Sequence, residues 1–349
     1  MSLQVFWFLL VAVLFIGYFV LEGFDYGVGM LMPIIGRKSE VKKRVVLNTI
    51  GPVWDGNEVW LLTAGGAMFA AFPEWYASLF SGFYLALLLI LVGLIARACA
   101  IEWRSKINDE RWRVWCDVGI GLGSWIPALA WGLAFANIVR GVKLNADKQI
   151  EGNLFDLLNP YALLGGLTTL LLFLLHGAVF ICLKTGGEVR DDAQAIVRKI
   201  FVPTAVVVAV FGIWTQLSYG HGWTWIPLVL AVIGLLVAGW AMTQGWDGWA
   251  FAGTALTILS ATVLLFGSLF PNVLPSSIDP AFSLTVDGRD GTVSASSTHY
   301  TLVVMSWVAV VMVPLVLGYQ AWTYWVFRKR LTMEQIPAPI GLPLESAKN

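Results

Sequence analysis

MSLQVFWFLLVAVLFIGYFVLEGF, residues 1–24, is the stretch that decides the fold class of this chain. It lacks the positively charged start and the small-residue cleavage site of a secretory signal peptide, and its apolar run is too long for one. About 20 apolar residues are enough to cross a bilayer as a helix. We therefore expect a first transmembrane helix that is retained in the mature protein.

The composition of the whole chain extends this interpretation. Of 349 residues, 58% are hydrophobic and 13% are charged, and the mean hydropathy is +0.75. Soluble domains carry about 25% charged residues. The net charge is zero, so there is no basic field to attract nucleic acid. The three cysteines are scattered and form no CxxC or Cys/His motif, which disfavours zinc and covalently attached haem.

Nine apolar segments predict an all-α, polytopic membrane protein that forms a single integral membrane domain over residues 1–349. The segment near 54–72 is the weakest of them, because its beginning is polar. The approximate spans are 5–34, 54–72, 76–101, 114–138, 160–183, 199–219, 223–243, 247–271 and 299–327.

Lysine and arginine are distributed unevenly between the links. The links after spans one, three and five, together with the tail after span nine, hold 17 of the 22 basic residues, and the opposite side holds four. Because cytoplasmic loops carry the excess of Lys and Arg, the N-terminus is expected outside and the C-terminus in the cytoplasm. An odd number of spans agrees with termini on opposite sides.

Carboxylates inside two of the spans call for an explanation. Glu22 and Asp25 lie in LEGFDYGVGML, and Asp55 and Glu58 lie in WDGNEVW. Each pair is spaced i, i+3, so both members share one helical face. An ionisable residue inside a span costs about 2.5–3.5 kcal/mol on insertion scales. With the predicted orientation, all four lie in the cytoplasmic half of the membrane and could form one proton-exchanging layer.

Two purely structural explanations of these acids remain open. The basic link at 37–44 could neutralise them at the membrane surface. Asp55 could be a helix N-cap with Glu58 in capping-box position. Either interpretation would leave the carboxylates without a role in chemistry.

The histidines do not suggest a haem site. His176 lies in span five, and only His221 and His299, at outer span edges, could share one depth. We expect surface or interfacial histidines rather than ligands.

Two further patterns concern charge pairing and repetition. Arg97 with Glu102, and Arg113 with Asp117, are expected to form interfacial ion pairs. SWIPALAWG at 124–132 and TWIPLVLAV at 224–232 are weakly similar in sequence, which is compatible with an inverted repeat.

Several long stretches resemble subunit II of cytochrome bd-type quinol oxidases. They are GFDYGVGML, LNTIGPVWDGNEVWLLTAGGAMFAAFPEWYASLFSGFY, DERWRVWCDVGIGLGSWIPALAWGLAFAN, FDLLNPYALLGG, FPNVLPSS and WVAVVMVPLVLGYQAWTYWVFRKR. They occur in order over nearly the whole chain, and the resemblance is thin only at about 185–265. It implies two four-helix bundles plus one peripheral helix.

The resemblance also implies a function. Such complexes sit in the bacterial cytoplasmic membrane, oxidise quinol and reduce O2 to water, with cytoplasmic protons and without a pump. Two b-type haems and one d-type haem are expected on subunit I, and this chain is expected to support that partner. A structural quinone, contacts with membrane lipid and small accessory subunits are further expectations.

The resemblance assigns roles to individual residues. Asp55 is expected at the mouth of a proton path. Glu58 occupies a position where relatives often have Gln, so the resemblance supports its role less than that of Asp55. Trp60 is a candidate for lining an oxygen entry. The residues expected along the proton path are Asp55, Glu58, Glu22, Asp25 and Asn57.

Two other classes of protein remain as alternatives. Intramembrane carboxylates beside glycines are also typical of a proton-coupled secondary transporter. In a purely structural subunit, the acids would serve only partner assembly.

Overall fold

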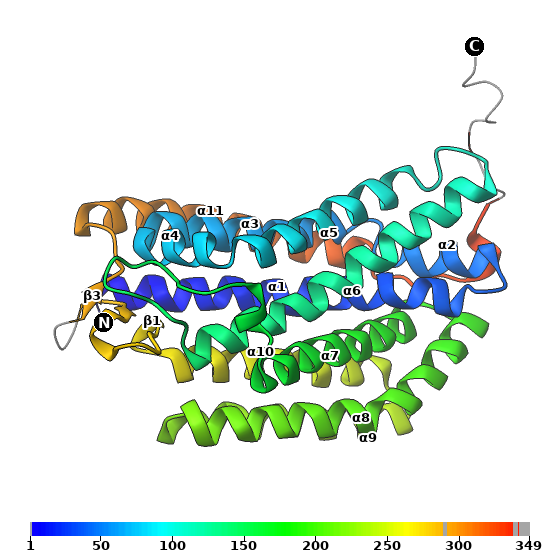
Figure 1. Ribbon diagram of the computed structural model, residues 1–349. Helices are drawn as coiled ribbons and strands as arrows, with labels where there is room; N and C mark the ends of the chain where they lie inside the picture. Colours follow the sequence, from blue (N-terminus) through cyan, green and yellow to red (C-terminus); the bar gives the residue numbers. More distant parts are fainter. Residues whose placement is uncertain (1, 289–291, 338–340, 342–349) are drawn as a thin grey trace, which may run out of the picture.

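The computed structural model describes residues 2–288, 292–337 and 341. The chain is an elongated bundle whose long helices run side by side between two ends (Figure 1). The N-terminus, α4 and the short strands lie at one end, here called the sheet end. The turns at α2, α5–α6 and α7–α8, together with residues 327–337, lie at the other, here called the basic end.

The long helices form two groups of four and one outlier. The first group contains α1 (Leu3–Ile35), α3 (Trp54–Ala71), α5 (Tyr84–Trp103) and α6 (Glu110–Arg140). The second contains α7 (Pro160–Lys184), α8 (Glu188–Tyr219), α9 (Trp225–Thr243) and α10 (Asp247–Leu269). The outlier, α11 (His299–Val326), contacts α1 and α3. This arrangement confirms the all-α architecture expected from the sequence.

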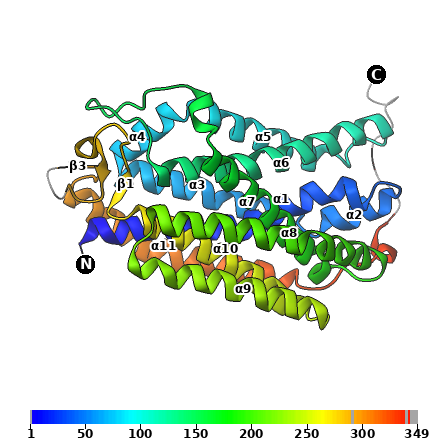
Figure 2. The ribbon, with the colours of Figure 1, turned by 60° about the horizontal axis from the view of Figure 1, so that its bottom comes forward.

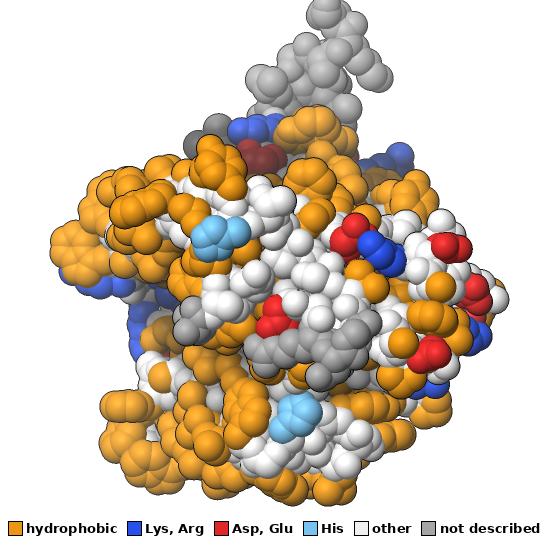
Figure 3. All heavy atoms as spheres, turned by 90° about the vertical axis from the view of Figure 1, so that its left-hand side faces the viewer, with side chains coloured by type: hydrophobic (Ala, Val, Ile, Leu, Met, Phe, Trp, Pro, Cys, Tyr) orange, Lys and Arg blue, Asp and Glu red, His pale blue; other side chains and the backbone are white. Residues whose placement is uncertain are grey.

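Short elements connect these helices. They are α2 (Glu40–Asn48), α4 (Pro73–Gly82), four 3-10 turns (Leu154–Leu157, Gly222–Thr224, Pro280–Phe282 and Met333–Gln335) and the strands β1 (Asn272–Leu274), β2 (Leu284–Thr285) and β3 (Val293–Ser294). The strands form a sheet in the order β1-β2-β3, with β1 and β2 antiparallel and β2 and β3 parallel. Figure 3 looks onto the sheet end, where polar groups gather in the middle and apolar side chains at the rim.

Among the described residues, eight helices are long and apolar enough to cross a membrane. The segment that is missing from this set is α3, which has 18 residues and begins with Trp-Asp-Gly-Asn-Glu. The predicted segment 76–101 is divided at Phe83 between α4 and α5. Of the two Trp-Ile-Pro stretches, one lies in the middle of α6 and the other in the first turn of α9, so they do not occupy equivalent positions.

Helix α1 is the centre of the fold, because it contacts helices of both groups. It crosses α7 at a pair of glycines. A Cβ added to Gly27 would lie 2.6 Å from the Cα of Gly177, and one added to Gly177 would lie 2.4 Å from the Cα of Gly27. In a membrane, where helices gain little from the hydrophobic effect, such small residues let backbones pack closely.

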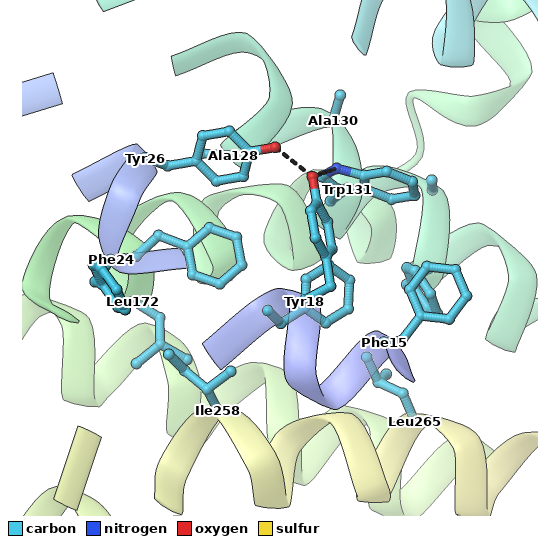
Figure 4. Packing of buried hydrophobic residues seen from close by; sticks show 14 of the residues in the cluster. Phe15, Tyr18, Phe24, Tyr26, Ala128, Ala130, Trp131, Leu172, Ile258 and Leu265 are labelled. Atoms are coloured by element: carbon cyan, nitrogen blue, oxygen red, sulfur yellow. Dashed lines mark hydrogen bonds between the residues drawn. The ribbon is translucent and has the colours of Figure 1, made fainter. Parts of the chain in front are cut away.

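Aromatic rings fill the core beside α1. The ring of Phe15 packs edge to face against Phe135 and against Trp131. The hydroxyl of Tyr18 accepts a hydrogen bond from the Trp131 indole at 3.0 Å and is also bonded to the hydroxyl of Tyr26 (Figure 4). The polar tips of these large side chains are therefore satisfied inside the bundle.

Ion pairs connect the helices at the basic end. This end contains α2 and lies opposite β1 and β3 (Figure 2). Arg104 binds Glu40 at 2.7 Å and Asp117 at 2.6 Å, and Lys43 binds Asp117 at 2.7 Å. The predicted pair of Arg113 with Asp117 is therefore wrong, because Asp117 faces two other cations.

We predict that Gly177→Val destabilises the protein. Its side chain would overlap α1 at Gly27, and overpacking of this kind costs about 1–3 kcal/mol. The thermal midpoint of the detergent-solubilised protein should fall. Gly248→Ala on α10 is the control, since a Cβ there meets nothing within 4 Å. An unchanged midpoint for Gly177→Val would contradict the close crossing.

Candidate functional site

Two acids of α1 lie on one buried helical face. Glu22 and Asp25 are both fully buried, as their i, i+3 spacing allows. The glycine after the first acid, Gly23, faces the ring of Phe173 rather than another helix backbone. The α1 acids are therefore enclosed by side chains and need polar partners inside the protein.

Arg97 of α5 supplies the positive charge at this site. Its guanidinium is fully buried, and Nη1 donates to Glu22 and, at 3.1 Å, to Glu58. The guanidinium carbon lies 5.1 Å from the centre of the Tyr26 ring. The predicted pair of Arg97 with Glu102 is wrong, since Arg97 points into the bundle and joins α1, α3 and α5.

Asn57 is the polar hub between α1, α3 and α11. Its Nδ2 donates to the carboxylate of Asp25 at 2.7 Å. Its Oδ1 accepts hydrogen bonds from the amide of Gln320 at 3.0 Å and from the hydroxyl of Tyr324 at 2.8 Å. Gln320 in turn accepts a hydrogen bond from the Trp60 indole at 2.7 Å. One buried amide thus binds three side chains directly and is linked to Trp60 through Gln320.

Trp60 lies against α1 because Gly17 leaves room for it. A Cβ on Gly17 would fall 2.1 Å from the indole ring. The ring is half-buried, and its N–H is held by α11. Its orientation is therefore set from two sides.

The acids of α3 differ in position. Glu58 reaches Arg97 while 21% of its side chain remains exposed. Asp55 is exposed and accepts a hydrogen bond from the backbone N–H of Gly56 at 2.8 Å. The N-cap of α3 is Val53, without a side-chain cap, so the capping interpretation of Asp55 is wrong. Glu22, Asp25 and Glu58 therefore gather near Arg97. The fourth predicted acid, Asp55, lies on the outer surface of α3.

Several atoms in this cluster have no protein partner among the described residues. They are Oε2 of Glu22, Oδ1 of Asp25, and Nε and Nη2 of Arg97. Buried polar atoms are normally satisfied by protein or by water. The cluster therefore has free hydrogen-bonding capacity on both its acids and its cation.

The histidines do not fit a haem within this chain. His176 is buried, and its ring nitrogens lie 2.7 Å from the Thr254 hydroxyl and 3.0 Å from the Val20 carbonyl. His221 and His299 are exposed, as expected, but His176 is not an interfacial residue. In the described part of the chain, no three His, Cys, Asp or Glu side chains are grouped to hold a metal ion.

Sequence reasoning missed Arg97, Gln320 and Tyr324 as members of the site. The cost of a charge inside a span, which identified the acids, also applies to Arg97 in its apolar helix. Gln320 and Tyr324 are spaced i, i+4 in an otherwise apolar segment, so they share one face of α11. Both signals were present in the sequence.

Comparison with known proteins agrees with this architecture. The family model for cytochrome bd terminal oxidase subunit II matches residues 3–327. The chain is 42% identical to the cytochrome bd ubiquinol oxidase subunit 2 of Bacillus subtilis, over 96% of this chain and 98% of the relative. It is 38% identical to the cytochrome bd-I ubiquinol oxidase subunit 2 of Escherichia coli, over 96% of each.

A solved structure shares the fold. The bd oxidase structure from Geobacillus thermodenitrificans matches with a TM-score of 0.73 at 16% identity, covering 93% of this chain and 99% of the matched chain. With a family match along nearly the whole length, the secondary-transporter alternative is wrong. The chain belongs to the cytochrome bd terminal oxidase subunit II family, and it is a component of an oxidoreductase complex of the membrane.

Proposed function

We propose that this chain pairs with a haem-bearing subunit I in a complex that oxidises membrane quinol and reduces O2 to water. The names of its relatives support this assignment. Two b-type haems and one d-type haem belong to subunit I in this proposal, since the histidines here do not fit a haem. The excess of Lys and Arg at the basic end supports placing that end in the cytoplasm of a bacterium.

The outer face of α3 is the proposed contact with subunit I. Its exposed residues are Asp55, Gly56, Val59, Leu62, Thr63, Gly66 and Phe69. A carboxylate facing lipid is costly, whereas protein can supply it with partners. At Gly56, Gly65 and Gly66 an added Cβ would meet nothing within 4 Å, so a helix of another chain could approach closely. This face therefore favours protein over lipid.

Protons are proposed to enter along α3 and to pass into the Arg97 cluster. Asp55 on the outer face is the first group, and Glu58, three residues on, is both partly exposed and bound to Arg97. Glu22 and Asp25 follow on α1, and Asn57 fixes the Asp25 carboxylate. The free hydrogen-bonding atoms of the cluster are suited to water, which would link these groups into a path.

Charge balance is the observation that carries this proposal. Glu22 and Glu58 bind one guanidinium, and Asp25 is buried three residues from Glu22 on the same helix. Buried charge without compensation is strongly unfavourable. One carboxylate is enough to balance the charge of Arg97, so the cluster holds more carboxyl groups than that charge requires. A group of carboxyls that shares protons around a fixed cation can accept a proton on one side and release it on the other.

Trp60 is proposed as part of the lining of an oxygen entry. Its ring is half-buried and held in one orientation by Gln320 and by the gap at Gly17. A structural quinone, bound lipid and small accessory subunits belong to the proposed complex without assigned residues.

We predict that Asp55→Asn slows O2 reduction by the complex at least tenfold. Its carboxylate would no longer deliver protons, while its exposed position makes no contact that folding needs. Oxygen consumption with excess quinol measures the effect, and haem absorption and subunit content check assembly. Full turnover would remove Asp55 from the path, and loss of subunit I would instead indicate a role in docking only.

We also predict that Arg97→Gln destabilises the complex, because it leaves Glu22 and Glu58 without a counter-charge. Removing one partner of a buried ion pair costs about 3–5 kcal/mol. The thermal midpoint and the yield of assembled complex are the measurements. The matched double variant, Arg97→Gln with Glu22→Gln, should recover part of the loss. A double variant as unstable as the single one would show that packing, not charge, decides the effect.

A further inference from the structure

A cavity lies at the basic end, and Tyr324, which binds Asn57 of the carboxylate cluster, is part of its lining. It has a volume of about 320 Å³ and is formed by α1, the α2–α3 link and the ends of α7, α10 and α11. Pockets that bind small molecules usually have about 300–1,000 Å³. Its size is therefore sufficient for part of a lipid chain.

The inner wall of this cavity is aromatic and apolar. Phe24 stacks on Phe180 with ring centres 3.9 Å apart, and Phe251 packs edge-on to Phe24 at 5.8 Å. Leu183 also lines the space. A wall of this kind favours hydrocarbon over water or a charged group.

Two cations, Lys184 and Arg328, also line the cavity. Lys184 donates to the backbone carbonyls of Phe327 and Lys329, and Arg328 stacks on Trp325 with its guanidinium carbon 4.4 Å from the ring centre. Neither cation has a carboxylate within ion-pair distance among the described residues, and the lining contains no acidic residue. The nearby acid of α10, Asp247, is already held by Arg190 at 3.0 Å and Arg330 at 2.7 Å.

We propose that this cavity binds an anionic phospholipid. One acyl chain enters between Phe24, Phe180 and Phe251, and the phosphate contacts Lys184 and Arg328. Arg328 uses one of its five N–H donors on the Trp325 carbonyl, which leaves donors for a phosphate oxygen.

Charge distinguishes this occupant from a neutral one. A quinone could fill the space beside the apolar wall but carries no charge, and the choline group of a zwitterionic lipid cancels the charge of its phosphate, so neither would bring net negative charge to the two cations. Basic pockets between transmembrane helices favour anionic headgroups. The combination of an apolar wall with two cations that have no carboxylate partner among the described residues is complementary to one anionic lipid.

The test uses the whole complex, purified in detergent, washed, and incubated with dioleoyl-phosphatidylglycerol or dioleoyl-phosphatidylcholine. Retained lipid is counted by mass spectrometry. We expect the complex to retain more phosphatidylglycerol than phosphatidylcholine. Replacing Lys184 and Arg328 with Gln should lower this retention by about fivefold for each cation. Lys329→Gln is the matched control, because Lys329 is exposed and does not line the cavity.

A second variant tests the apolar half of the site. Leu183→Trp should fill the cavity and reduce phosphatidylglycerol retention while both cations remain. Equal retention of the two lipids, a control as impaired as the double variant, or a neutral quinone held in place of lipid would each overturn the proposal.

Discussion

The buried cation Arg97 organises the polar interior between α1, α3 and α5. Arg97 joins three helices whose apolar surfaces do little to distinguish one register from another, since lipid-facing and protein-facing apolar surfaces are chemically alike. Its bonds to Glu22 and Glu58 fix how α1, α3 and α5 are placed along one another. In an apolar bundle, such a contact has few substitutes, because any shift would leave a charge unpaired.

The second constraint is the amide of Asn57, which holds α11 to the bundle. In the most apolar window of α11 only 6% of residues are buried, against 72% in α7. The contacts of Gln320 and Tyr324 with Asn57 therefore give α11 a fixed position that its sparse packing does not. Since Asn57 also binds Asp25, the position of the peripheral helix is coupled to the acidic cluster.

The fold could be predicted from the sequence further than the site could. Hydropathy and the spacing of apolar segments locate the helices, because each span must satisfy its own backbone in the membrane. The cost of buried charge identified Glu22, Asp25 and Glu58. What brings Arg97 to them is a contact over 75 residues of sequence, which periodicity along one helix cannot reveal. The predicted pair of Arg97 with Glu102 rested on their proximity in sequence. In the structure, Arg97 instead binds Glu22 and Glu58 inside the bundle.

Asp55 shows why one chain of a membrane complex gives an incomplete picture of burial. On this chain it is exposed, and by hydropathy alone its helix is the least suited of the long helices to face lipid. The surface of α5, where Leu85, Leu89 and Val92 are exposed, has no such polar group and is compatible with hydrocarbon. Hydrophobicity cannot separate a lipid contact from an apolar subunit contact, but an ionisable group can, because only protein or water offers it partners. The outer face of α3 is therefore suited to protein or water rather than to lipid, and the path that we propose from Asp55 to Arg97 begins on this face.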